Sequence, residues 1–174
     1  LHSFRQVTAA GFEALSKGCP NITELALFEV EVDPHDPQPL LHTTEFTNLT
    51  KLLLCCCTAV LDQDIMKIAS SNPSLVEVRL QQCLNVTDDG VCYLSARCPL
   101  LKKLCVTYAQ ICNDTFSQLA KTSTQLTHLE ISPMENFDET DGVREAFTNL
   151  TQLRRLDASH CSFFQDERVL RALL

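Results

Sequence analysis

Ten of the 174 residues are cysteines, the side chains here best suited to bind metals, form disulfides or act as nucleophiles. A structural zinc site needs paired Cys-x2-Cys units whose thiolates converge. Cys55, Cys56 and Cys57 are consecutive instead, and side chains on a strand alternate between its two faces. We therefore expect no metal and no cofactor, and we favour free thiols over a disulfide framework. Free thiols predict a reducing compartment, cytoplasmic or nuclear.

A nucleophilic cysteine needs a neighbouring base, and Cys105 with His128 is the pair to consider, because the repeat described below places them on neighbouring strands. A third, orienting group is not evident beyond Glu130, and an open sheet offers no oxyanion hole. The chain has only four glycines and no glycine-rich phosphate loop. Acidic pairs such as Asp88 and Asp89 suit helix N-termini, where the helix dipole favours them. We therefore predict no catalytic residues and no enzyme.

Composition narrows the class of partner. The formal net charge is -8 and the pI is about 5.0, so the chain lacks the basic surface that nucleic-acid binding requires. A membrane span needs about 20 consecutive apolar residues, and the longest candidate, residues 52–57, is only strand-sized. We expect a soluble chain with protein partners, no nucleic acid and no membrane insertion.

An internal repeat must position these side chains, because the apolar pattern L-x-x-L-x-L recurs along the whole chain. Its first positions are Ile22, Leu49, Leu75, Leu101, Leu126 and Leu153. The successive spacings are 27, 26, 26, 25 and 27 residues, too regular to arise by chance. Residues 85–91 then indicate a turn and a helix cap, which predicts that each unit is a strand, a turn and a short helix.

Several cysteines recur at fixed places in this unit, either before the strand or where the chain leaves it. We predict that they are small, buried apolar groups. They are Cys19, Cys57, Cys83, Cys98 and Cys161. Asn72 takes the place of cysteine before one of the strands, in Asn72-Pro73.

The whole chain, residues 1–174, is expected to form one domain and to be a fragment of a longer protein. Residues 1–20 fit a truncated unit that starts partway through a strand, and residues 165–174 fit a last helix. Bare solenoid ends would expose core, so flanking sequence or a partner should cover them.

Two segments depart from the repeat. Pro34, Pro37 and Pro39 disfavour a regular helix until after Pro39. Residues 133–141 are predicted to form an acidic loop. Both segments are candidate contact loops, and the alternative is ordinary loop variation without a function.

The chain resembles the cysteine-containing class of leucine-rich repeats, on its period, its Cys-Pro elements and the motif Thr87-Asp88-Asp89-Gly90. The resemblance covers nearly the whole chain. It implies an α/β solenoid of about six repeats, with a parallel sheet on the concave face and short helices on the convex face. This class occurs in F-box substrate receptors of cullin-RING ubiquitin ligases and in related proteins without an F-box. It therefore implies a protein-interaction module. One role is the substrate-recognition domain of an F-box-type (SCF) receptor, with its F-box upstream of Leu1. The alternative role is a scaffold subunit of a larger assembly.

Alternate positions of each strand point toward the concave surface. The candidate partner-binding residues there are Phe28, Leu53, Cys55, Glu77, Arg79, Lys103, Cys105, His128, Glu130 and Arg155. An apolar patch beside charged residues is typical of a protein interface. The alternative is that the charges only pair across strands, Lys51 beside Glu77 and Lys103 beside Glu77 or His128.

Five Asn-x-Thr sequons match the acceptor motif for N-glycosylation. They are Asn21, Asn48, Asn85, Asn113 and Asn149. Each lies beside a predicted core strand or in a predicted turn, so we expect these asparagines to serve turn geometry rather than to carry glycans.

Overall fold

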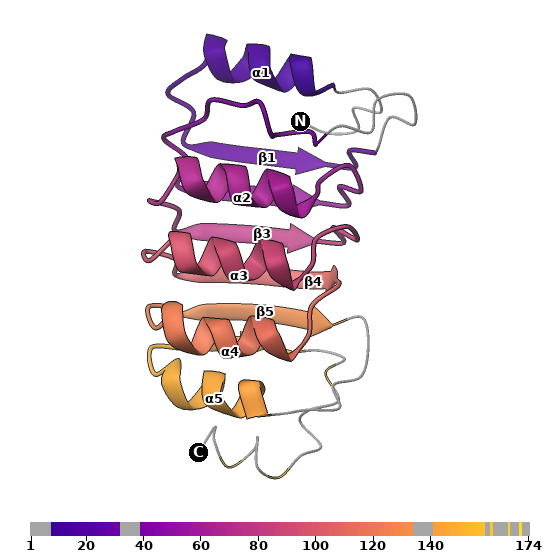
Figure 1. Ribbon diagram of the computed structural model, residues 1–174. Helices are drawn as coiled ribbons and strands as arrows, with labels where there is room; N and C mark the ends of the chain where they lie inside the picture. Colours follow the sequence, from indigo (N-terminus) through magenta and orange to yellow (C-terminus); the bar gives the residue numbers. More distant parts are fainter. Residues whose placement is uncertain are drawn as a thin grey trace.

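The computed structural model describes residues 8–31, 39–133, 141–158, 161, 167 and 171. Six parallel strands form one sheet in chain order: β1 (Glu24–Phe28), β2 (Lys51–Cys55), β3 (Glu77–Gln81), β4 (Lys103–Ala109), β5 (His128–Pro133) and β6 (Arg155–Asp157). Five helices stack along one side of this sheet (Figure 1): α1 (Ala9–Gly18), α2 (Asp62–Ser71), α3 (Asp88–Arg97), α4 (Asn113–Thr122) and α5 (Asp141–Asn149). The predicted α/β leucine-rich-repeat solenoid is confirmed.

The repeated apolar residues form the core between the sheet and the helices. The strand register aligns equivalent positions, so that Leu25, Leu52 and Val78 lie side by side across β1, β2 and β3. All three are buried, and the residues that alternate with the buried ones along each strand face the other side of the sheet. The pattern read from the sequence is thus a stack of matched apolar layers.

The first repeat has an irregular segment where the others have a helix. Pro39 and the described residues that follow it, up to the start of β2, contain no helix, whereas the prolines predict an irregular chain only as far as Pro39. The buried carboxylate of Asp64 holds this segment by accepting hydrogen bonds from the backbone N–H groups of Leu41 (2.5 Å) and Leu61 (2.9 Å). Burial raises the pKa of Asp64.

Helix N-termini are linked from one repeat to the next by a row of hydrogen bonds that we call the cap ladder. A cap was predicted within residues 85–91, and Thr87 is the residue that caps α3. Its N–H and hydroxyl donate to the Asp62 carboxylate in α2 (2.9 and 2.8 Å). Asp88 in turn accepts from the N–H and the hydroxyl of Thr115 (3.0 and 2.5 Å). Asn113 accepts from the first turn of α5 at 3.0 Å. Each of α2, α3 and α4 thereby fixes the start of the next helix.

The cysteine prediction is correct for the interior repeats and wrong for Cys19. Cys57, Cys83 and Cys98 are buried, Cys161 is half-buried, and Cys19 is exposed. The Cys98 thiol lies against two backbone carbonyls of the preceding repeat, at 3.7 and 4.0 Å. Cys19 follows α1, the first described helix, and is exposed there.

Several sequon asparagines make hydrogen bonds between repeats, which goes beyond the turn geometry predicted for them. The side-chain amide of Asn48 donates to the Pro20 carbonyl (2.9 Å), and that of Asn85 donates to the Thr58 carbonyl (2.7 Å). The side chain of Asn113 is the last step of the cap ladder.

Four of the sequence predictions fall wholly or partly on residues outside the described ranges. They concern the partial strand in residues 1–7, the proline-rich segment at 32–38, the acidic loop at 134–140, and the last helix, of which only Glu167 and Arg171 are described.

Candidate functional site

Seven of the ten predicted interface residues line one hollow of about 220 Å³ on the sheet face opposite the helices. They are Glu77, Arg79, Lys103, Cys105, His128, Glu130 and Arg155. These side chains come from β3, β4, β5 and β6, which the sheet places next to one another. The repeat register therefore brings together residues 78 positions apart in sequence, from Glu77 to Arg155.

Ion pairs cross the floor of this hollow. Arg79 Nη1 lies 3.4 Å from Glu130 Oε2, and Lys103 Nζ lies 3.3 Å from Glu77 Oε2. The Lys103–Glu77 pair is one of those expected from the sequence. These side chains are partly exposed, and such pairs typically contribute about 0–1 kcal/mol. The two ion pairs orient these side chains, and pairs this weak can be broken when a partner binds the same charged groups.

Lys51 makes a different pair from the one expected. The register places it opposite Glu77, but its Nζ atom lies 3.3 Å from the carboxylate of Glu24 on the other side. Glu77 is occupied by Lys103, which explains the choice.

The β6 side of the hollow is cationic although the chain as a whole is acidic. Arg155 is exposed and lies opposite His128 in the register. His128 Nδ1 is 2.9 Å from the hydroxyl of Thr127. With Arg79 and Lys103, the hollow has three permanent cations against two carboxylates. It therefore suits a partner that presents a carboxylate or a hydrogen-bond acceptor.

The other three predicted residues lie outside the hollow, on β1 and β2. Phe28 faces Cys55 in the register, and Leu53 lies between Ala26 and Arg79. All of them are half-buried. They form an apolar strip on the same sheet face, on the two strands that precede β3, so the apolar and the charged parts of the predicted interface are adjacent but not merged.

Cys105 and His128 are on neighbouring strands, as expected, but they are not directly opposite each other in the register. Cys105 lies opposite Glu130, whereas His128 lies opposite Lys103. Burial raises the pKa of the Cys105 thiol to about 12, although Arg79, whose Nη1 atom is 3.5 Å from the sulfur, acts in the opposite direction. A thiol with this pKa is almost entirely protonated at neutral pH and is a poor nucleophile.

We expect iodoacetamide to modify Cys19 much faster than Cys83 or Cys105 in the native chain. Cys19 is exposed, whereas burial excludes the reagent from Cys83 and Cys105 and raises the pKa of each to about 12. A raised pKa lowers the thiolate fraction at a given pH, so these two rates should still be rising above pH 9. Peptide mapping by mass spectrometry measures each site, with the unfolded chain as control. Early modification of Cys105 at pH 7 would contradict the assignment.

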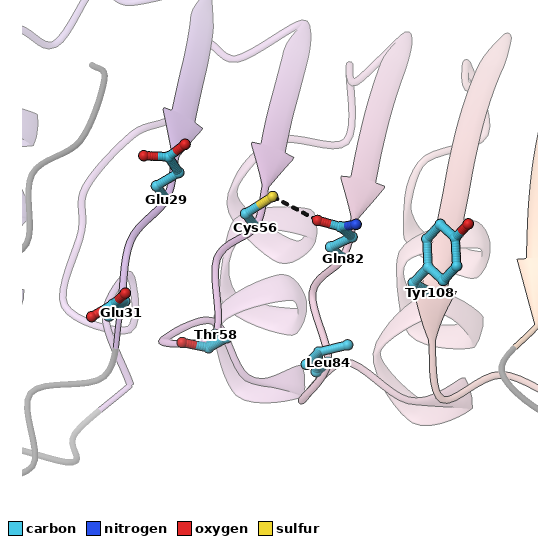
Figure 2. A pocket seen from close by; sticks show the side chains of 7 residues that line it. All are labelled: Glu29, Glu31, Cys56, Thr58, Gln82, Leu84 and Tyr108. Atoms are coloured by element: carbon cyan, nitrogen blue, oxygen red, sulfur yellow. Dashed lines mark hydrogen bonds between the residues drawn. The ribbon is translucent and has the colours of Figure 1, made fainter.

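A second hollow was not predicted. A groove of about 450 Å³ lies where the chain leaves the C-terminal ends of β1, β2, β3 and β4 (Figure 2). It is lined by Glu29, Glu31, Cys56, Thr58, Gln82, Leu84 and Tyr108. A signal was present, because Glu29, Cys56, Gln82 and Tyr108 each follow the first apolar position of a repeat by seven residues. The row lies one position beyond the alternating strand residues from which the concave face was predicted.

The described ranges contain neither a cluster of metal ligands nor a membrane-spanning helix. Their His, Cys, Asp and Glu side chains do not gather in threes as a metal site would require. Their helices lack the length and apolar character of a membrane span.

No protein-family profile matches the chain. Two curated proteins are similar in sequence. The chain is 32% identical over 103 residues to Antagonist of mitotic exit network protein 1 of Saccharomyces cerevisiae, covering 59% of this chain and 18% of that protein. It is 27% identical over 172 residues to F-box/LRR-repeat protein 4 of Bos taurus, covering 81% of this chain and 27% of that protein. The chain thus spans about a fifth to a quarter of the length of these relatives.

Solved structures share the fold at low sequence identity. A tropomodulin C-terminal domain from Caenorhabditis elegans matches with a TM-score of 0.54 and 12% identity, over 93% of this chain and 88% of that one. A chain of the yeast Rad7–Elc1 complex matches with a TM-score of 0.59 and 20% identity, over 96% of this chain and 40% of that one. Together with the register and the buried repeats, these likenesses show that the chain folds as a leucine-rich-repeat solenoid.

Proposed function

We propose that the chain is a non-enzymatic protein-interaction module that holds its partner on the concave sheet face. The observation that carries the proposal is the hollow across β3 to β6, where seven predicted residues meet. Its cations and carboxylates are already oriented by ion pairs, and the apolar strip of Phe28, Leu53 and Cys55 lies beside it. Apolar contacts supply affinity and oriented charges supply specificity, so the two parts together suit a folded or extended protein partner.

The more specific proposal is substrate recognition in an F-box-type (SCF) ubiquitin ligase receptor, with the F-box in sequence upstream of Leu1. The similarity to an F-box/LRR-repeat protein over 81% of this chain supports it. The alternative is a scaffold subunit of an assembly without a ligase role, which the likeness to a chain of a two-protein complex supports. The ten free thiols favour an intracellular, reducing location, cytoplasmic or nuclear, for either role.

Affinity purification of the full-length protein from its native cells, followed by mass spectrometry, separates the two roles. Recovery of a cullin with its small adaptor would support the receptor role, and the concave face would then be a substrate site. A stoichiometric set of other subunits without a cullin would contradict the receptor role and support the scaffold.

The concave face can be tested independently with any partner recovered. We expect the double variant Phe28→Ala/Arg79→Ala to weaken binding at least about tenfold, because aromatic and arginine side chains dominate interface energies. The matched control is Tyr93→Ala/Arg97→Ala, an exposed aromatic and an exposed arginine on helix α3. Isothermal titration calorimetry measures affinity, and circular dichroism checks that both variants stay folded. Unchanged affinity in the first variant, or an equal loss in the control, would move the binding site away from the concave face.

A further inference from the structure

The groove at the C-terminal ends of the strands is built on a row of strained residues. Glu29, Cys56, Gln82 and Tyr108 have φ angles of 56°, 55°, 54° and 54°, all in the left-handed region. That region is unfavourable for residues other than glycine, so the repeat imposes this conformation at the same point of four successive units. The result is that four side chains are presented side by side along one edge of the sheet (Figure 2).

The two ends of the groove differ in chemistry. Glu29 and Glu31, both exposed, supply carboxylates at the β1 end. At the other end lie Leu84 and Tyr108, whose exposed fractions are 41% and 44%. They are two of the four large hydrophobic residues that are exposed in the described part of the chain. An anionic end and an exposed apolar end are therefore joined in one hollow.

The middle of the groove is polar and uncharged. The Cys56 thiol donates a hydrogen bond to Gln82 Oε1 at 2.8 Å, and Thr58 lies beside them (Figure 2). Polar, uncharged side chains can lie against a peptide backbone, and they do not select one particular side chain of the peptide.

We propose that this groove binds an extended segment of a partner protein that carries Arg or Lys followed or preceded at short distance by an apolar residue. The cation pairs with the carboxylates at the β1 end, and the apolar side chain covers Leu84 and Tyr108. Neighbouring strands lie about 4.8 Å apart, so the two or three steps from β1 to β3 or β4 span about 10–14 Å. An extended chain advances about 3.3 Å per residue, which places the two side chains about three or four residues apart.

This second surface is distinct from the concave hollow and adds to the proposed interaction function. The hollow has an excess of cations and suits an acidic partner, whereas the groove suits a basic and apolar one. The net charge of -8 also favours a partner other than a second copy of this acidic chain. Because the test below uses peptides and no cellular partner, the groove and the proposed function can fail separately.

A random dodecapeptide library displayed on phage tests the proposal against the immobilised chain. We expect the selected sequences to contain Arg or Lys three or four residues from Leu, Phe, Met or Tyr. Fluorescence anisotropy then measures the selected peptide and the same peptide with Glu in place of its cation, for which we expect at least a tenfold loss of affinity. Acidic sequences selected in addition would belong to the concave hollow. Absence of basic and apolar sequences from the selected pool, or no loss on the charge change, would overturn the proposal.

Variants of the chain locate the binding. Glu31→Lys and Leu84→Gln alter exposed side chains at the two ends of the groove, and each should weaken the selected peptide at least about fivefold. The matched controls are Glu145→Lys on α5 and Leu100→Gln, which lies before β4 and is 53% exposed; these should leave affinity unchanged. Equal effects in the controls, or none in the groove variants, would place the peptide elsewhere on the chain.

Discussion

Replacing Asn72 with alanine is expected to lower the free energy of unfolding by about 3 kcal/mol, because several buried polar groups lose their partner at once. Asn72 is 1% exposed. Its amide nitrogen donates to the carbonyls of Phe46 (2.8 Å) and Ile68 (2.9 Å), and its side-chain oxygen accepts from the N–H of Leu49 (2.8 Å). One side chain thus closes the irregular segment of the first repeat onto α2 and the start of β2.

The matched control is Asn48→Ala. Asn48 is exposed and donates one hydrogen bond to the Pro20 carbonyl, so its loss should cost less than about 1 kcal/mol. Urea denaturation followed by circular dichroism measures both variants. Asn72→Cys, which copies the residue found at the equivalent Cys98, should fall between wild type and Asn72→Ala because a thiol donates only weakly. If Asn72→Ala and Asn48→Ala were equally stable, the network would not be energetically important.

Gly90→Ala is expected to lower the free energy of unfolding by about 2 kcal/mol, within the usual range for overpacking. A Cβ atom at Gly90 would lie 3.2 Å from Cγ and 3.3 Å from Cα of Asp62, and it would overlap a carboxylate oxygen of the same residue. Asp62 would have to move, and its two hydrogen bonds to Thr87 in the cap ladder would be lost or lengthened. The small residue is therefore needed for close approach of α2 and α3.

Gly18 provides the control, because no atom lies within 4 Å of a Cβ built there. Gly18→Ala should leave stability unchanged or raise it by up to about 1 kcal/mol, since alanine favours a helix more than glycine does. The Asp62→Ala background adds a second check, because the cost of Gly90→Ala should shrink when the side chain that it meets is removed. A cost that is the same in both backgrounds would show that Asp62 is not the source of the strain.

The sequence predicted those parts of the fold that are repeated. The strands, the Thr87 cap and the burial of Cys57 and Cys83 all follow from a short apolar pattern with a constant period, and each recurs in equivalent surroundings. The same period placed the residues of the concave hollow on neighbouring strands. Periodicity alone therefore determined which side chains share a face.

The remaining features depend on contacts that differ between repeats. Cys19 occupies the same repeat position as Cys98 but is exposed, whereas Cys98 is buried. Lys51 has a carboxylate within reach on either side, and the pair that forms depends on Lys103 holding Glu77. The groove was not predicted because its row lies at or just beyond the C-terminal ends of the strands, at positions where the residue types Glu, Cys, Gln and Tyr share no chemical pattern.

The cap ladder also determines how the length of such a chain can change. Its bonds join residues 25, 27 and 29 positions apart, which is about one repeat, and each joins only neighbouring units. A duplication or deletion of one whole unit leaves every remaining side chain with an equivalent partner one unit away. Loss of half a unit leaves a carboxylate on one helix without a cap to hold on the next. Variation in the length of this architecture should therefore come in whole units, and a recognition surface can be lengthened without redesigning what already exists.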